Sequence, residues 1–129
     1  MAQPADRLYT KSHEWIKIAG DEAAVGITEY AQEQLGDVVF VELPPVGKAL
    51  AKGGVLGNIE SVKAVSEVFA PAAGSVVAAN ADLESHPELV NQDPYGKGWL
   101  VKLKVAAGAA AGLLDAAAYE KFLAEEGAH

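Results

Sequence analysis

The sequence has 129 residues and a mass of 13.4 kDa, which is the size of one domain with a core of moderate size. Its net charge of −8 disfavours binding to nucleic-acid backbones and anionic membrane surfaces, and the absence of cysteine excludes disulfides, thiolate metal sites and cysteine nucleophiles. The polar N-terminus is unlike a signal peptide, and no apolar run approaches the ~20 residues of a membrane helix. We therefore expect one domain over residues 1–129 in the cytoplasm, although a mature organelle protein would have the same features.

The first third of the chain predicts a β-hairpin followed by a short helix. Residues 15–18 and 23–27 have the apolar content of strands, and Gly20 and Asp21 lie between them in a turn. Thr28 can cap a helix over residues 29–35, and Gly36 stands where a helix would end. A strand is expected next, over residues 38–43, because valine and phenylalanine favour β-structure and two prolines follow.

The middle of the chain predicts a second hairpin with a lysine at its tip. Two short apolar runs, 55–61 and 65–69, are separated by Val62, Lys63 and Ala64. A further strand is expected over residues 75–79.

The last third predicts a strand and a closing helix. The strand is expected over residues 99–105, after a polar segment rich in proline and glycine. A helix over about 115–126 can begin at Asp115, with Tyr119, Phe122 and Leu123 on one face. Short strands between turns, with helices only near residue 30 and at the C-terminus, predict a mainly β fold of antiparallel sheets, either a sandwich or a partly open barrel.

Motifs for most enzyme classes are absent. There is no dinucleotide-binding fingerprint, no phosphate-binding loop and no nucleophile elbow. The three histidines, His13, His86 and His129, lack the spacing of a helical zinc site, so we expect no metal. Taken alone, Glu14 is a solvated neighbour of a core tryptophan, and a hairpin lysine flanked by glutamates is an ordinary charged turn.

Several segments taken together indicate one protein family more specifically than any of these single residues does. The sequence resembles the glycine cleavage system H-protein family, and Gly57–Ala64 is similar to the lipoyl-attachment hairpin of that family. The resemblance implies a barrel-sandwich hybrid of antiparallel sheets, like that of lipoyl and biotinyl domains. The segments that carry the resemblance are Gly57–Ala64, Phe69-Ala70-Pro71, Ser12-His13-Glu14-Trp15, Val25–Thr28, Leu35-Gly36-Asp37, Val41–Pro44, Pro94-Tyr95-Gly96 and Gly98-Trp99-Leu100. Biotin carriers typically have Met-Lys-Met at the tip, which Val62-Lys63-Ala64 does not match.

The resemblance implies that Lys63 carries lipoate in amide linkage, in the hairpin context of Glu60, Ser61 and Ala64. The chain would then be a carrier rather than an enzyme. It would shuttle an aminomethyl group between a pyridoxal-phosphate glycine decarboxylase, an aminomethyltransferase and a dihydrolipoamide dehydrogenase. A lipoate ligase or a lipoyl/octanoyl transferase would attach the arm.

The resemblance also implies a cleft that receives the loaded arm beside Ser12, Glu14 and Glu67. Glu67 departs from the family, which commonly has Asp at this place. A second departure is the segment 105–118, whose alanine and glycine content predicts a variable surface loop.

Three alternative functions remain open at this point. An H-like relay would pass lipoate to other lipoyl enzymes and needs the same lysine and fold. An unmodified β-sandwich binding module and a hydrolytic enzyme with a dispersed polar site would both leave Lys63 unacylated.

Overall fold

A computed structural model describes residues 4–127. Its strands and helices are, in chain order, β1 (Leu8–Tyr9), β2 (Glu14–Ala19), β3 (Glu22–Ile27), α1 (Glu29–Leu35), β4 (Val38–Glu42), β5 (Ala49–Leu50), β6 (Val55–Ser61), β7 (Val65–Phe69), β8 (Gly74–Ala79), α2 (Asp82–Ser85), α3 (Leu89–Gln92), β9 (Val101–Val105) and α4 (Ala116–Gly127). His129 lies outside the described residues.

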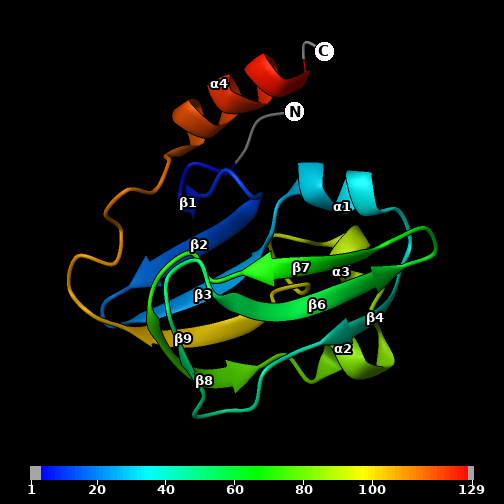
Figure 1. Ribbon diagram of the computed structural model, residues 1–129, viewed down its shortest axis with the longest axis horizontal. Helices are drawn as coiled ribbons and strands as arrows, with labels where there is room; N and C mark the ends of the chain where they lie inside the picture. The colour runs from blue at the N-terminus through cyan, green and yellow to red at the C-terminus, as the bar shows by residue number, and fades with distance from the viewer. Residues whose placement is uncertain (1–3, 128–129) are drawn as a thin grey trace.

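The strands form two antiparallel sheets that do not close into a barrel (Figure 1). The larger sheet has the order β1-β2-β3-β9-β8-β5, and the smaller has the order β4-β6-β7. In β9, Val101, Leu103 and Val105 are buried while the two lysines between them are exposed, so one face of the strand points to the core. The mainly β fold predicted from the sequence is confirmed.

The core lies between the two sheets. Buried side chains from both sheets meet there, among them Ile16, Val25 and Leu103 from the larger sheet and Ile59 and Val68 from the smaller. A separate aromatic cluster of Tyr9, Trp15 and Tyr119 packs α4 against the β1–β2 end of the larger sheet. Helix α4 therefore lies outside the sandwich, across its N-terminal edge (Figure 1).

Local signals placed most of these elements correctly. Helix α1 has its predicted cap, because Thr28 Oγ1 accepts a hydrogen bond from the Ala31 N–H. Gly36, with φ of 77°, ends that helix in a conformation that favours glycine. Asp115 Oδ1 accepts from the Ala118 N–H at the start of α4.

The expectation that helices occur only near residue 30 and at the C-terminus is wrong. Helices α2 and α3 lie in the segment expected to be an irregular polar loop, and each has four residues and no side-chain cap. One helical turn is too short to show a hydrophobic period, which is why the pattern gave no signal. Strand β9 also begins two residues later than predicted, at Val101.

Candidate functional site

The tip of the β6–β7 hairpin is a tight turn organised by Ser61. The Ser61 N–H donates to the Ala64 carbonyl oxygen over 2.8 Å, and the Ser61 hydroxyl oxygen accepts from the N–H groups of Lys63 and Ala64 at 3.3 and 3.1 Å. A serine hydroxyl that binds the next backbone amides is a common way to fix a turn. Ser61 thus sets the backbone from which Lys63 projects.

The tip also contacts the loop after α1. The Val62 N–H donates to the Asp37 carbonyl oxygen over 3.0 Å. The Lys63 side chain, which is exposed, passes over Gly36, where an added Cβ would lie only 3.1 Å from Lys63 Cε. A glycine at this position therefore leaves room for the stem of the lysine.

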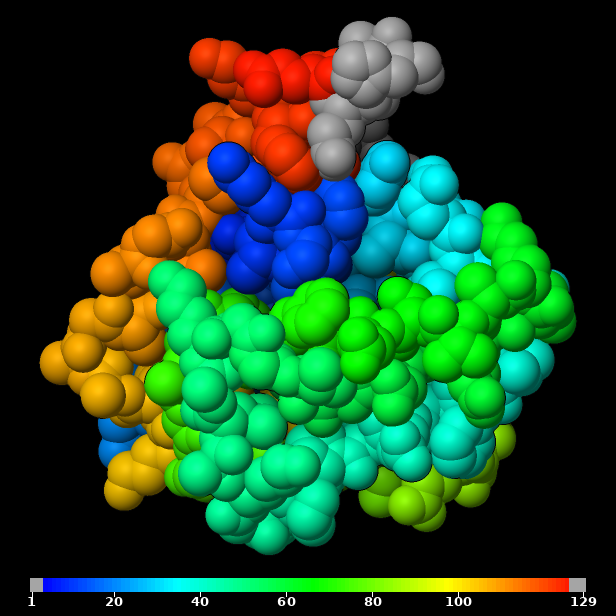
Figure 2. All heavy atoms as spheres, in the orientation of Figure 1, coloured from blue at the N-terminus to red at the C-terminus, as the bar shows by residue number. Residues whose placement is uncertain are grey.

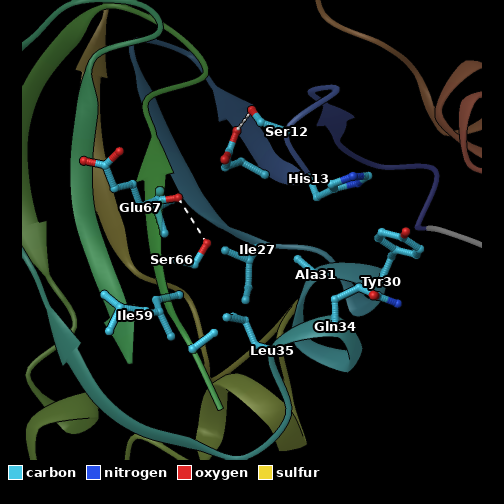
Figure 3. Close-up of a pocket in the computed structure, with 14 residues that line it drawn as sticks. Ser12, His13, Ile27, Tyr30, Ala31, Gln34, Leu35, Ile59, Ser66 and Glu67 are labelled. Carbon is cyan, nitrogen blue, oxygen red and sulfur yellow. Dashed lines mark hydrogen bonds between the residues drawn. The ribbon is translucent and has the colours of Figure 1, made fainter. Parts of the chain in front are cut away.

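A pocket of about 290 Å³ lies beside this hairpin. Its walls come from the residues before and at the start of β2, from α1, and from β6 and β7, which meet on the face shown in Figure 2. Apolar side chains such as Ile27, Leu35 and Ile59 line it together with polar groups, which lie on the Ser12 side and, at Gln34, on the side of α1 (Figure 3). Such a mixed lining suits a ligand that has both apolar and polar parts.

The carboxylate of Glu14 is the most buried charged group of the pocket, with an exposed fraction of 2%. Its Oε1 accepts hydrogen bonds from the hydroxyls of Thr10 and Ser12, each at 2.6 Å, and Oε2 accepts from the Phe69 N–H at 3.3 Å. Burial raises the pKa of Glu14 above its ordinary value, although these donors favour the charged form. The interpretation of Glu14 as a solvated strand-edge residue is therefore wrong, because it is buried and fully bonded.

The structure brings several of the predicted site residues together. Ser12, Glu14, Ala64 and Glu67 all line the pocket, whereas Lys63 stands at the tip next to it. The Glu67 carboxylate points away from Ser12 and His13 in Figure 3, and Ser66 is the residue of β7 that points toward them. Glu60 lies on β6 opposite Val65, at the base of the tip.

Sequence reasoning missed three partners of this site. Thr10 and the Phe69 N–H bind the Glu14 carboxylate, and Ser66 faces the pocket. A threonine four residues before the glutamate is a weak signal by itself. The contact of Glu14 with Phe69 joins two sheets, so nothing local in the sequence predicts it.

Comparison with known proteins gives a consistent result. The family model of the glycine cleavage H-protein matches residues 7–126. The chain belongs to the glycine cleavage H-protein family. The resemblance inferred from the sequence is thus confirmed, and with it the role of the chain as the H-protein component of the glycine cleavage system.

H-proteins of several bacteria match this chain over nearly its whole length. The glycine cleavage system H protein of Nitratidesulfovibrio vulgaris is 56% identical over 126 residues, covering 98% of each chain. That of Laribacter hongkongensis is 59% identical over 120 residues, covering 92% of this chain and 94% of its own. A crystal structure of the H protein from Mycobacterium marinum superposes with a TM-score of 0.86 at 41% identity, covering 97% and 99% of the two chains.

Proposed function

We propose that this H-protein carries lipoate on Lys63 and acts as one non-catalytic carrier domain in the cytoplasm. It passes an aminomethyl group between glycine decarboxylase, aminomethyltransferase and dihydrolipoamide dehydrogenase. The observation that supports this most is the exposed Lys63 at a hydrogen-bonded hairpin tip, directly beside a pocket with a buried carboxylate. In the described residues, no group of His, Cys, Asp or Glu side chains is placed to hold a metal ion. No helix among residues 4–127 is long and apolar enough to cross a membrane.

The residues present fit a lipoyl arm. An attaching enzyme and three partners must all reach one amine, and a side chain at the end of two paired strands meets that need. Lipoate supplies a dithiolane whose sulfurs accept a one-carbon unit and are reoxidised by thiol–disulfide exchange. The chain has no cysteine, so those sulfurs are chemistry that its own residues cannot provide.

The pocket gives the chain a second task, which is to shelter the cargo. The amine of an aminomethyl group is a cation at neutral pH, and the Ser12 hydroxyl and Glu14 carboxylate are hydrogen-bonded polar groups of the pocket lining. These groups orient an ammonium by charge-assisted hydrogen bonds, while Ile27, Leu35 and Ile59 exclude water from the arm beside it. Glu67 contributes negative charge at the outer edge, since its carboxylate is exposed.

Intact mass spectrometry tests the attachment. The unmodified chain, incubated with lipoate, ATP and a lipoate ligase, should gain the mass of one lipoyl group. The Lys63→Arg variant keeps the positive charge and should gain none, whereas Lys48→Arg, at an exposed position away from the hairpin, should react like the wild type. A lipoylated Lys63→Arg variant would refute the assignment.

A second measurement tests the carrier role. The lipoylated chain, mixed with glycine and the decarboxylase, should gain the mass of the aminomethyl group and lose it when the aminomethyltransferase and tetrahydrofolate are added. A chain that accepts lipoate but never gains this mass, and instead donates lipoate to another lipoyl enzyme, would identify a relay.

A further inference from the structure

His13 adopts a backbone conformation that needs support. It lies between Ser12 and Glu14, and its φ of 72° makes it the one non-glycine residue with positive φ in the described part of the chain. Residues with a side chain rarely adopt this backbone conformation, because their Cβ atom crowds the neighbouring backbone. The hydrogen bond from Ser12 to Glu14 depends on this turn, since the two residues flank it.

One hydroxyl group reaches His13 from the far end of the sequence. Tyr119, on α4, places its Oη 2.8 Å from His13 Nδ1 and 2.8 Å from Thr28 Oγ1. Burial raises the pKa of Tyr119, so the group is a neutral hydroxyl that donates to one partner and accepts from the other. The Tyr119 ring is fully buried and stacks on Tyr9 with 4.8 Å between ring centroids, which fixes the position of the hydroxyl.

Both partners of this hydroxyl belong to walls of the pocket. His13 lines the pocket itself, and Thr28 caps α1, which contributes Tyr30, Ala31, Gln34 and Leu35 to the adjacent wall. The two walls are also tied by a hydrogen bond from the Thr28 N–H to the His13 carbonyl oxygen at 3.1 Å. The His13 ring also packs against the ring of Tyr30, which lies on α1 (Figure 3).

We propose that Tyr119 is a positioning residue of the pocket, which holds the turn of Ser12, His13 and Glu14 in register with the start of α1. Helix α4 is thereby part of the site, although none of its described side chains lines the pocket. When the hydroxyl is removed, the turn at His13 relaxes and Ser12 withdraws from the Glu14 carboxylate. The inference deepens the proposed function, but its first test uses the unmodified chain.

That test measures the pKa of Glu14 by NMR with carboxyl-labelled glutamate, in wild type and two matched variants. Tyr119→Phe removes the hydroxyl described above. Tyr9→Phe removes a neighbouring buried hydroxyl of the same aromatic cluster, whose partner is the Pro4 carbonyl oxygen rather than a pocket residue. The other titratable residues that line the pocket, His13, Tyr30 and Glu67, are present in both variants.

The expected result separates positioning from stability. Tyr119→Phe should raise the Glu14 pKa by about half a pH unit, because the carboxylate loses a donor, and Tyr9→Phe should leave it unmoved. Both variants should lower the thermal midpoint to a similar extent. Equal pKa values in wild type and Tyr119→Phe, or equal rises in the two variants, would overturn the proposal.

A double-mutant cycle tests the route through His13. Glycine adopts positive φ without cost, so His13→Gly removes the need for an anchor. In that background Tyr119→Phe should no longer change the Glu14 pKa, and an undiminished effect would contradict the proposal. On the lipoylated and loaded chain, Tyr119→Phe should also speed spontaneous loss of the one-carbon unit on the order of five-fold, with Tyr9→Phe unchanged. Failure of Lys63 to accept lipoate would refute the proposed function, yet the measurements on the unmodified chain would still decide the role of Tyr119.

Discussion

The Glu14 carboxylate belongs to the larger sheet and accepts a hydrogen bond from the backbone of the smaller one, at Phe69. Its other donors, Thr10 and Ser12, come from the turn before β2. A buried carboxylate with three donors keeps its place when the pocket is empty of ligand. It is thus preorganised for a cation and needs no rearrangement when one arrives.

Replacing Glu14 with glutamine should weaken the shelter for the cargo. The side chain keeps its shape but loses the charge that pairs with an ammonium, a hydrogen bond worth about 1.5–3 kcal/mol when water is excluded. We expect Glu14→Gln to release the one-carbon unit from the loaded chain at least several-fold faster than wild type at neutral pH, as followed by mass spectrometry. Lipoylation and reoxidation by the dehydrogenase should stay near normal. Equal decay rates would remove Glu14 from the mechanism.

Gly26 is a second residue whose identity is fixed by a close neighbour. A Cβ at this position would lie 2.6 Å from the Trp15 indole ring, and that ring is held by a hydrogen bond from Nε1 to the Pro94 carbonyl oxygen at 2.9 Å. We expect Gly26→Ala to lower the free energy of unfolding by about 1–3 kcal/mol, measured by urea denaturation, because the indole must shift. In a Trp15→Phe background, where the ring is smaller, the same substitution should cost less. An equal cost in both backgrounds would show that the indole is not the obstacle.

At the scale of elements, the β6–β7 hairpin is a mostly local structure, and a hydrogen bond from the Val62 N–H to the Asp37 carbonyl oxygen ties its tip to the loop after α1. Strands β6 and β7 pair over Val55 to Phe69, and the Ser61 hydroxyl closes the turn. Under the proposed function, a ligase that recognises Lys63 therefore meets a surface built by the fifteen hairpin residues together with the loop at Gly36 and Asp37.

Substitution of Ser61 should disturb this tip and little else. Ser61→Ala removes the acceptor for the Lys63 and Ala64 N–H groups, so the turn samples more conformations and the initial rate of lipoylation should fall a few-fold. The thermal midpoint should change little, because surface substitutions usually alter stability by less than about 0.5 kcal/mol. Ser75→Ala, on β8, serves as the control and should react at the wild-type rate. An unchanged rate in Ser61→Ala would show that the ligase tolerates a loose turn.

The same locality explains which elements could be predicted from the sequence. Strands β6 and β7, helix α1 and helix α4 carry their own signals, namely apolar runs, a capping threonine or aspartate, and a terminal glycine. The pocket is different, because its walls are joined by contacts between residues 14 and 69 and between residues 13 and 119. The resemblance to the family predicted Ser12, Glu14 and Lys63 as site residues. The roles of Thr10, Ser66 and Tyr119 follow only from the folded structure.

For the whole molecule, Glu14 gives stability a definite dependence on pH. Burial raises the pKa of Glu14 in the folded protein above its ordinary 4.5, so the folded state holds this proton more tightly than the unfolded chain does. The stabilising contribution of the protonated group is fully present below the unfolded pKa and is lost as the pH rises through the folded pKa.

Unfolding measured against pH in wild type and Glu14→Gln tests this sign. The free energy of unfolding of wild type, minus that of the variant, should decrease as the pH rises above 4.5 and then level off. Arg7 and Lys17 lower the pKa of Asp6 to about 2, so Asp6 makes the free energy of unfolding change with pH in the opposite direction. Asp6 is present in both proteins, so its contribution cancels in the difference. A difference that grows with pH would mean that the hydrogen bonds to Glu14 outweigh its burial.

The link between His13 and Tyr119 spans 106 positions of the chain, while the attachment hairpin ends fifty residues before Tyr119. Because a ribosome makes the chain from its N-terminus, the segment that bears Lys63 emerges well before α4 exists. Under the proposed function, the residue to be lipoylated is therefore synthesised before the residue that anchors the pocket. Under the proposed function, a product cut short before residue 119 would contain Lys63 but would lack the hydroxyl that anchors His13. Such a product would compete with the intact chain for lipoate and would lose its one-carbon unit faster.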